Sequence, residues 1–155
     1  SSDLVWSIRQ EPAAVIKAAF ASTDRTRVNQ HFGAAECFVV YEVTPDKATL
    51  VGVAEFAEEA MDGNEDKLGA KVDFLEGCAA VYVMAIGASV IKKLMARGVQ
   101  PIRINEIDAV NDLLSEVSKA MSDGGVAWID RAIAAQTKAK AEDRFASMAE
   151  EGWEG

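Results

Sequence analysis

Apolar runs recur along the chain at lengths typical of buried strands. The first run is almost entirely apolar, and the second is rich in β-branched and aromatic residues. Turn chemistry at Thr44-Pro45-Asp46-Lys47 separates the second run from the third, so these two are expected to form an antiparallel hairpin. The five predicted strands are 15–21, 37–43, 48–56, 78–84 and 100–104.

Helical periodicity follows the third strand. In the first helix Leu68, Val72 and Leu75 share one face, and the same spacing places Lys71 among them. Capping residues and glycines predict where the helices begin and end. The predicted caps and stops are Asn64, Gly77, Gly87, Gly98, Asp108 and Gly124. The four predicted helices are 65–76, 88–97, 108–122 and 126–149.

This order of elements predicts an α/β protein with three layers, α/β/α, and a mixed five-stranded sheet. Helices are expected on both faces, because the first and fourth strands are apolar on both sides. The length suits one domain. We expect a lead-in segment at 1–14, a core domain at 15–135, and a charged helical extension or tail at 136–155.

The charge balance narrows the classes of partner. The chain has 16 Lys and Arg against 25 Asp and Glu, a net charge of −9. An acidic chain lacks the basic footprint for non-specific binding to nucleic acid or anionic membranes. No apolar run approaches the length of a spanning helix, and no signal peptide is visible, so we expect a cytoplasmic protein. The start at Ser1 suits a chain from which an upstream segment was removed.

The only histidine lies in a polar stretch after the first strand, residues 22–35, which we term the histidine loop. His31 is preceded by Arg25 and Arg27 and followed by Gly33. Imidazole is a common ligand of borderline metals, and guanidinium groups pair with anions, so the loop is suited to a ligand that is part metal and part anion. From the residues alone, an ordinary loop whose histidine donates to a carbonyl is the simpler explanation. With few apolar side chains, the loop is expected to be mobile when empty.

A second loop is expected to meet the first. Ligands of open α/β sheets bind beyond the carboxyl ends of parallel strands. The fourth predicted strand ends in the turn Met84–Ser89, which we term the 84–89 turn. If its strand lies parallel to the first, both loops face one cleft, and the helix that opens at Gly87 turns its amide end toward an anion. Close packing of the helix on the sheet explains Gly87 equally well. For Met84, a position in the hydrophobic core is the alternative explanation.

Other chemistries fit the chain less well. Its carboxylates lack the convergent spacing of a two-metal nuclease, and no GxSxG is present. Cys37 and His31 resemble a thiol–imidazole pair, but no residue is apparent to orient the base. Two cysteines and one histidine do not supply a closed zinc site. We interpret Cys37 as a buried thiol. Cys78 is excluded from the candidate site, because it begins its strand at the opposite end of the sheet.

Four segments together resemble a known family. Val28-Asn29-Gln30-His31-Phe32-Gly33 is similar to the V-[DN]-x-H-F-G signature of the dinitrogenase iron–molybdenum cofactor-binding family. Three further segments resemble the nitrogenase-accessory branch of this family, which contains NifX-, NifY- and NafY-like proteins. The resemblance extends from about Val15 to Ile133. The three segments are 61–68, 75–82 and 94–101.

The resemblance implies a ribonuclease-H-like fold without nuclease activity. It implies a carrier or chaperone for the iron–molybdenum cofactor, or for its iron–sulfur precursor, bound as cargo. The expected partners are apo-dinitrogenase and other cofactor-assembly proteins, with no nucleic acid, no membrane and a monomer when free. The alternative is an interaction protein that stabilises apo-dinitrogenase, with cofactor contact secondary.

The resemblance also implies a role for His31 as the metal ligand. Arg25 and Arg27 would meet carboxylates or sulfides of the cargo, and an extended loop would place Asn29 on the same side. Some family members have a cysteine in the loop where this chain has Met84, so a thiolate ligand is missing here. The expected cofactor-binding residues are Arg25, Arg27, Asn29, His31, Gly33, Met84, Gly87 and Ser89.

Overall fold

The computed structural model describes residues 14–56 and 65–152 of the chain. Three segments lie outside the described residues: residues 1–13 of the lead-in, residues 57–64 with the predicted cap Asn64, and residues 153–155. The described strands are β1 (Ile16–Ala21), β2 (Arg27–Val28), β3 (Cys37–Val43), β4 (Ala48–Glu55), β5 (Ala80–Val83), β6 (Gln100–Arg103) and β7 (Asp108–Ala109). The described helices are α2 (Glu65–Phe74), α3 (Ala88–Ala96), α4 (Val110–Asp123) and α5 (Ala127–Gly152).

Five strands form one mixed sheet in the order β4-β3-β1-β5-β6. β3 is antiparallel to β4, as the predicted hairpin requires, and it is also antiparallel to β1. β5 is parallel to β1 and to β6. The predicted mixed five-stranded sheet is therefore confirmed, and so is the parallel pairing of the first and fourth predicted strands.

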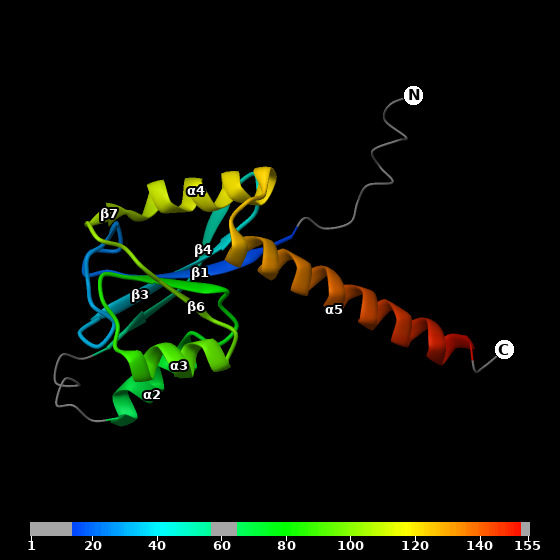
Figure 1. Cartoon of the computed structure of the whole chain (residues 1–155), viewed down its shortest axis with the longest axis horizontal. Coiled ribbons are helices and arrows are strands. Elements are labelled where there is room, and N and C mark those ends of the chain that lie inside the picture. The colour runs from blue at the N-terminus through cyan, green and yellow to red at the C-terminus, as the bar shows by residue number, and fades with distance from the viewer. Residues whose placement is uncertain (1–13, 57–64, 153–155) are drawn as a thin grey trace.

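Alternate residues of β1 serve two separate cores. Ile16, Ala18 and Phe20 pack toward α4 and α5, whereas Ala19 and Ala21 pack toward α2 and α3. Figure 1 shows α4 on one side of the sheet and α2 and α3 on the other. Helices thus cover both faces, which the apolar character of the first strand predicted. β1 lies at the centre of the protein, and the segment that leaves its carboxyl end starts from a rigid position.

Some boundaries differ from the predictions. Asp108 does not cap α4: it belongs to β7, Ala109 is the N-cap, and the Asp108 carboxylate accepts a hydrogen bond from the Ala109 N–H. The ribbon of β2 and β7 was not predicted, because two residues per strand leave no periodicity. The predicted final helix, 126–149, is observed as α5, which runs unbroken across residues 135 and 136 and leads away from the body (Figure 1). Within the described residues, no helix is long and apolar enough to cross a membrane.

Candidate functional site

The histidine loop and the 84–89 turn lie side by side at one edge of the sheet. Beyond the paired strands β1 and β5, the Met84 N–H donates to the Gln30 carbonyl at 2.9 Å, and the Phe32 N–H donates to the Ala85 carbonyl at 2.8 Å. These bonds run on either side of His31. The two loops therefore border one surface, as the parallel order of their strands predicted.

Side chains of the histidine loop alternate between buried and outward positions from Arg27 to Gly33. Val28, Gln30 and Phe32 are buried, and Phe32 is only 1% exposed. Arg27, His31 and Gly33 are exposed between them. This period of two is that of a strand, so the even residues anchor the segment and the odd residues face outward. The expectation of a mobile loop rested on a lack of apolar anchors, and that premise is wrong at Val28 and Phe32.

Two side chains organise the first half of the loop. The Ser22 hydroxyl accepts hydrogen bonds from the N–H groups of Asp24 and Arg25. The Asp24 carboxylate accepts from the N–H groups of Thr26 and Arg27 at 2.9 and 3.0 Å. The Thr26 N–H and the Arg27 guanidinium hold the pKa of Asp24 well below its usual range. The residues between Ala21 and Asn29, whose backbones are hydrogen-bonded, thus form a closed turn.

Arg25 adopts a backbone conformation that L-residues avoid. Its φ is +70°, which costs a non-glycine residue about 1–2 kcal/mol. An extended loop was expected to place Arg25, Arg27, Asn29 and His31 on one side. The positive φ of Arg25 changes the direction of the backbone there, so this arrangement does not include Arg25 and begins only at Arg27. The Arg25 guanidinium instead reaches β4, where it pairs with Glu55 at 3.1 Å.

Both guanidinium groups have a carboxylate partner within the chain. Arg27 pairs with Asp24 through two nitrogens, at 2.8 and 2.9 Å, and Arg25 pairs with Glu55. The pairs are exposed, so each attraction is weakened by water and contributes little to stability. An anionic ligand would compete with Asp24 and Glu55 for the same donors. Asn29 is less available, because its amide bonds to the N–H and hydroxyl of Thr23.

His31 is the exposed residue of this surface whose side chain can ligate a metal. Its imidazole makes no hydrogen bond with another described residue, in contrast to the ordinary-loop explanation. The described residues also include no group of three or more His, Cys, Asp or Glu able to hold a metal ion. Imidazole nitrogen is a good ligand for iron and other borderline metals, so His31 offers a single point of attachment rather than a cage.

Glycines leave the surface bare on both sides of His31. A Cβ added at Gly33 or at Gly87 would meet nothing within 4 Å, and neither residue has a positive φ. Close helix–sheet packing therefore does not explain Gly87. It is the N-cap of α3, without a side-chain cap bond, and both Gly87 and Ser89 are exposed. The free amides of α3 thus begin at the same edge as His31.

A buried lysine lies beneath the histidine loop. Lys71, on α2, is 3% exposed, and its Nζ donates to the Gly33 carbonyl at 2.9 Å and toward the Phe32 carbonyl at 3.4 Å. Burial lowers the pKa of Lys71. The sequence analysis gave this residue no function. Its only signal was a lysine at a position of the α2 stripe that otherwise holds apolar residues.

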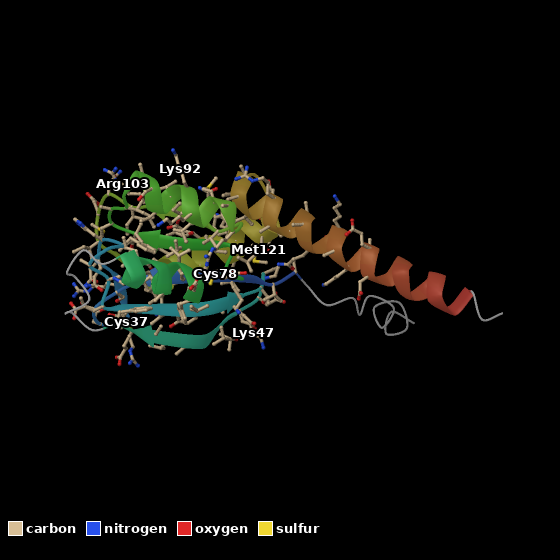
Figure 2. All side chains as sticks on the ribbon, turned by 90° about the horizontal axis from the view of Figure 1, so that it is seen from below. Cys37, Lys47, Cys78, Lys92, Arg103 and Met121 are labelled. Atoms are coloured by element: carbon tan, nitrogen blue, oxygen red, sulfur yellow. The ribbon has the colours of Figure 1, made fainter. Side chains whose placement is uncertain are left out.

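The cysteines and Met84 offer little to a ligand in this arrangement. Cys37 is buried at the start of β3, and burial raises the pKa of its thiol. Cys78 is also buried, and the adjacent Ala79 N–H bonds to Lys17 near the start of β1, so it lies at the far end of the sheet. Figure 2 labels both, with Cys78 nearer to α5. Met84 is half-buried and presents a thioether where a thiolate would be the stronger ligand.

The cavities found among the described residues lie away from the candidate surface. Three cavities of about 320, 640 and 490 Å³ lie elsewhere on the described part of the chain, the first two along α5 and the third between α4 and the β3–β4 turn. None of them is lined by a candidate residue. The shared cleft therefore stays an expectation, and what the structure gives is a shared edge at which Phe32 and Gln30 are buried beside the exposed His31.

Comparison with known proteins identifies the family. Residues 14–120 match the family model described as "Dinitrogenase iron-molybdenum cofactor". The chain belongs to this family. The resemblance read from the His-Phe-Gly segment is thereby confirmed.

Individual proteins agree with this assignment. The chain is similar to Protein NifX of Azotobacter vinelandii, with 43% identity over 145 residues, covering 94% of this chain and 91% of that protein. It is 34% identical over 111 residues to the FeMo cofactor biosynthesis protein NifB of Frankia alni, covering 68% of this chain and 21% of that protein. The crystal structure of PH0822 has the same fold, with a TM-score of 0.53 and 19% identity, over 66% of this chain and 88% of that one.

Proposed function

We propose that this protein is a non-catalytic carrier that binds the nitrogenase iron–molybdenum cofactor, or its iron–sulfur precursor, during cofactor assembly and delivery to apo-dinitrogenase. Family membership supports this cargo, as does the similarity to a protein named for FeMo cofactor biosynthesis. A ribonuclease-H-like fold, a cytoplasmic location and a monomeric free state belong to the same proposal. The hairpin at one side of β1 and the parallel strands at the other support that fold.

One observation carries the assignment to this surface. The exposed His31 stands on a backbone that is bonded on both sides to the 84–89 turn, with Gly33 and Gly87 leaving room beside it. In the proposal, the imidazole binds a metal of the cluster, and Arg27 and Arg25 bind its carboxylate or sulfide groups. Asn29, Met84 and Ser89 have supporting positions.

The geometry suits a cargo that must be released. A closed cage of several protein ligands holds a metal too firmly for transfer. Here one imidazole supplies the metal bond, and the two arginines exchange Asp24 and Glu55 for the anionic groups of the cargo. Because either set of carboxylates can satisfy the guanidinium groups, release leaves no unpaired charge behind.

The experiment is anaerobic gel filtration of the protein with isolated cofactor, followed by metal analysis of the protein fraction. We expect His31→Ala to retain much less molybdenum and iron than the wild type, with unchanged unfolding, because an exposed side chain contributes little to stability. Thr49→Ala, at an exposed position near the far end of β4, is the matched control. Equal metal retention by wild type and His31→Ala would refute the assignment.

A second function is favoured by α5. Its described residues 137–143 are all exposed, and the helix leads away from the body (Figure 1). An exposed helix of this kind is a surface for a protein partner, and apo-dinitrogenase is the partner we propose. Capture of apo-dinitrogenase by cofactor-free His31→Ala protein separates the two functions. Undiminished capture would assign partner binding to a surface other than the histidine loop.

A further inference from the structure

Lys71 is a charged residue in a place where an apolar one would pack at lower cost. Its buried neighbours are Val72 on α2, which is 1% exposed, and Leu75 in the turn after α2, which is 0% exposed. Burial of an ammonium group is costly unless its donors are satisfied. Lys71 therefore requires specific partners, and these partners show what its charge does.

The partners are the two carbonyls that directly follow His31. Nζ donates to the Gly33 carbonyl at 2.9 Å and toward the Phe32 carbonyl at 3.4 Å, and it lies 5.6 Å from the centre of the Phe56 ring. A charged donor makes a stronger bond to a carbonyl than a neutral one, and an aromatic face stabilises a cation. All three contacts lie on the inner side of the histidine loop.

The peptide after His31 is consequently fixed at both of its ends. On one side the Phe32 N–H is bonded to Ala85, and on the other the Phe32 and Gly33 carbonyls are drawn inward to Lys71. With Phe32 buried beneath, the backbone cannot rotate without breaking these bonds. This fixes the direction in which the Cα–Cβ bond of His31 leaves the chain.

We infer that Lys71 is a positioning residue that holds the His31 imidazole outward for the metal of the cargo. The inference rests on the proposed function of His31 as a metal ligand. Lys71 does not contact the cargo itself, since the loop covers it. Its function is to orient a ligand from behind, through the backbone that follows His31. Loss of a group that bonds directly to a metal-binding side chain typically lowers metal affinity about 10–100-fold, and the low end of this range is expected for an effect carried by the backbone.

The first experiment needs no cargo. Because His31 is the only histidine in the chain, its ring Cε1–Hε1 pair gives one unambiguous NMR signal. In Lys71→Met, which keeps an unbranched side chain one atom shorter and removes the charge, we expect this signal to move or broaden at fixed pH. Signals from α4, which packs on the opposite face of the sheet, should stay in place. Lys92→Met is the matched control, since Lys92 is exposed on α3 and points away from the body (Figure 2).

A second variant covers the case in which Lys71→Met does not fold. Lys71→Arg keeps a buried cation, but the longer side chain and rigid planar guanidinium place their donors differently from an ammonium beside the two carbonyls, so the His31 signal should move in this variant as well. A folded Lys71 variant whose His31 signal coincides with that of the wild type would overturn the inference.

The second experiment adds isolated cofactor under anaerobic conditions. We expect Lys71→Met to bind it about 10-fold or more weakly than the wild type, while Lys92→Met binds it equally well. If the wild type does not bind cofactor, the proposed function fails, and the cargo-free signal of His31 still decides whether Lys71 positions it. If wild type and Lys71→Met bind equally, only the positioning inference fails.

Discussion

Arg25 and Arg27 show how single residues can be held ready for a ligand. Each is exposed and paired with one carboxylate, Glu55 and Asp24 respectively, so neither is fixed by burial. Arg25 also holds its place at a backbone conformation with a positive φ. Strained positions of this kind persist where the surroundings determine them, here through the Ser22 and Asp24 hydrogen bonds, and they occur often at binding sites.

Gly33 leads to a prediction that separates stability from binding by means of two substitutions. Its φ is not positive and no atom obstructs a Cβ, so Gly33→Ala should stabilise the protein by about 0.4–1 kcal/mol through the unfolded chain. Gly33→Leu should fold as well, but its side chain would occupy the bare surface beside His31 and reduce cofactor retention.

Urea unfolding and anaerobic gel filtration of the two Gly33 variants check this. Cofactor retention by Gly33→Leu equal to that of the wild type would show that the cargo does not lie over Gly33. A loss of stability in Gly33→Ala would show that the backbone needs glycine there.

The sequence predicted the outward residues of the loop better than the inward ones. His31 and Arg27 follow from the period of two that Val28 and Phe32 impose. Lys71 could not be assigned from the sequence, because a lysine within an apolar helical stripe is compatible with a solvent-exposed flank. Only the three-dimensional contact with Phe32 and Gly33 gives it a function. The pairing of Arg25 with Glu55, thirty positions along the chain, was equally inaccessible.

At the level of elements, the placement of the site follows from β1 and β5. Both strands are buried on both faces, which predicts central positions and a shared edge for the loops that follow them. The ribbon of β2 and β7 was not foreseen, although it fixes the loop to the start of α4 through the Val110 N–H and the Thr26 carbonyl. Ribbons this short arise from tertiary contacts rather than from local propensity.

Asp24 makes the stability of the first half of the histidine loop depend on pH. Its folded pKa is held far below the value of about 3.9 expected in the unfolded chain, so its ionised form stabilises the fold. That contribution is complete above about pH 5 and is lost as pH falls through 4 toward the lowered folded pKa. In Asp24→Asn the contribution is missing at every pH.

Thermal unfolding of wild type and Asp24→Asn between pH 3 and pH 6 tests this. The wild type should have the higher midpoint at pH 6, and the difference should shrink toward pH 3. Asp46→Asn, at an exposed turn position in contact with the Thr44 hydroxyl, is the matched control. A difference that is constant across this pH range would mean that Asp24 does not hold the loop by its charge.

At the scale of the whole molecule, the two proposed functions occupy opposite ends of the sheet. The histidine loop leaves the carboxyl end of β1, whereas the Gln136 side chain of α5 is hydrogen-bonded to Val15, just before the start of β1. The chain is acidic overall, at −9, yet the loop presents Arg25 and Arg27 outward. This separation allows a carrier to hold an anionic cargo at one end and a protein partner at the other.

Two truncations of α5 test this division of the molecule. Removing residues 138–155 keeps Gln136, and the described side chains removed, 138–143, are all exposed. Stability should therefore change by only about 0.5 kcal/mol, and cofactor retention should be unaffected.

Removing residues 127–155 also removes Ile129, which is 2% exposed, and Trp128, which packs edge-on against Tyr82. Loss of a buried isoleucine and a tryptophan costs several kcal/mol, a large fraction of the stability of such a domain, so cooperative unfolding should disappear.

Apo-dinitrogenase capture by the shorter truncation then decides the function of the helix end. We expect the protein without residues 138–155 to retain cofactor at the wild-type level and to lose apo-dinitrogenase, because the exposed part of α5 is the proposed partner surface and lies far from His31. Loss of cofactor together with the helix end would contradict the separation, since it would make α5 part of the cargo site. Retention of both cofactor and apo-dinitrogenase would move the partner surface to the body, where the open edge around His31 is the remaining place for a partner to receive the cargo directly.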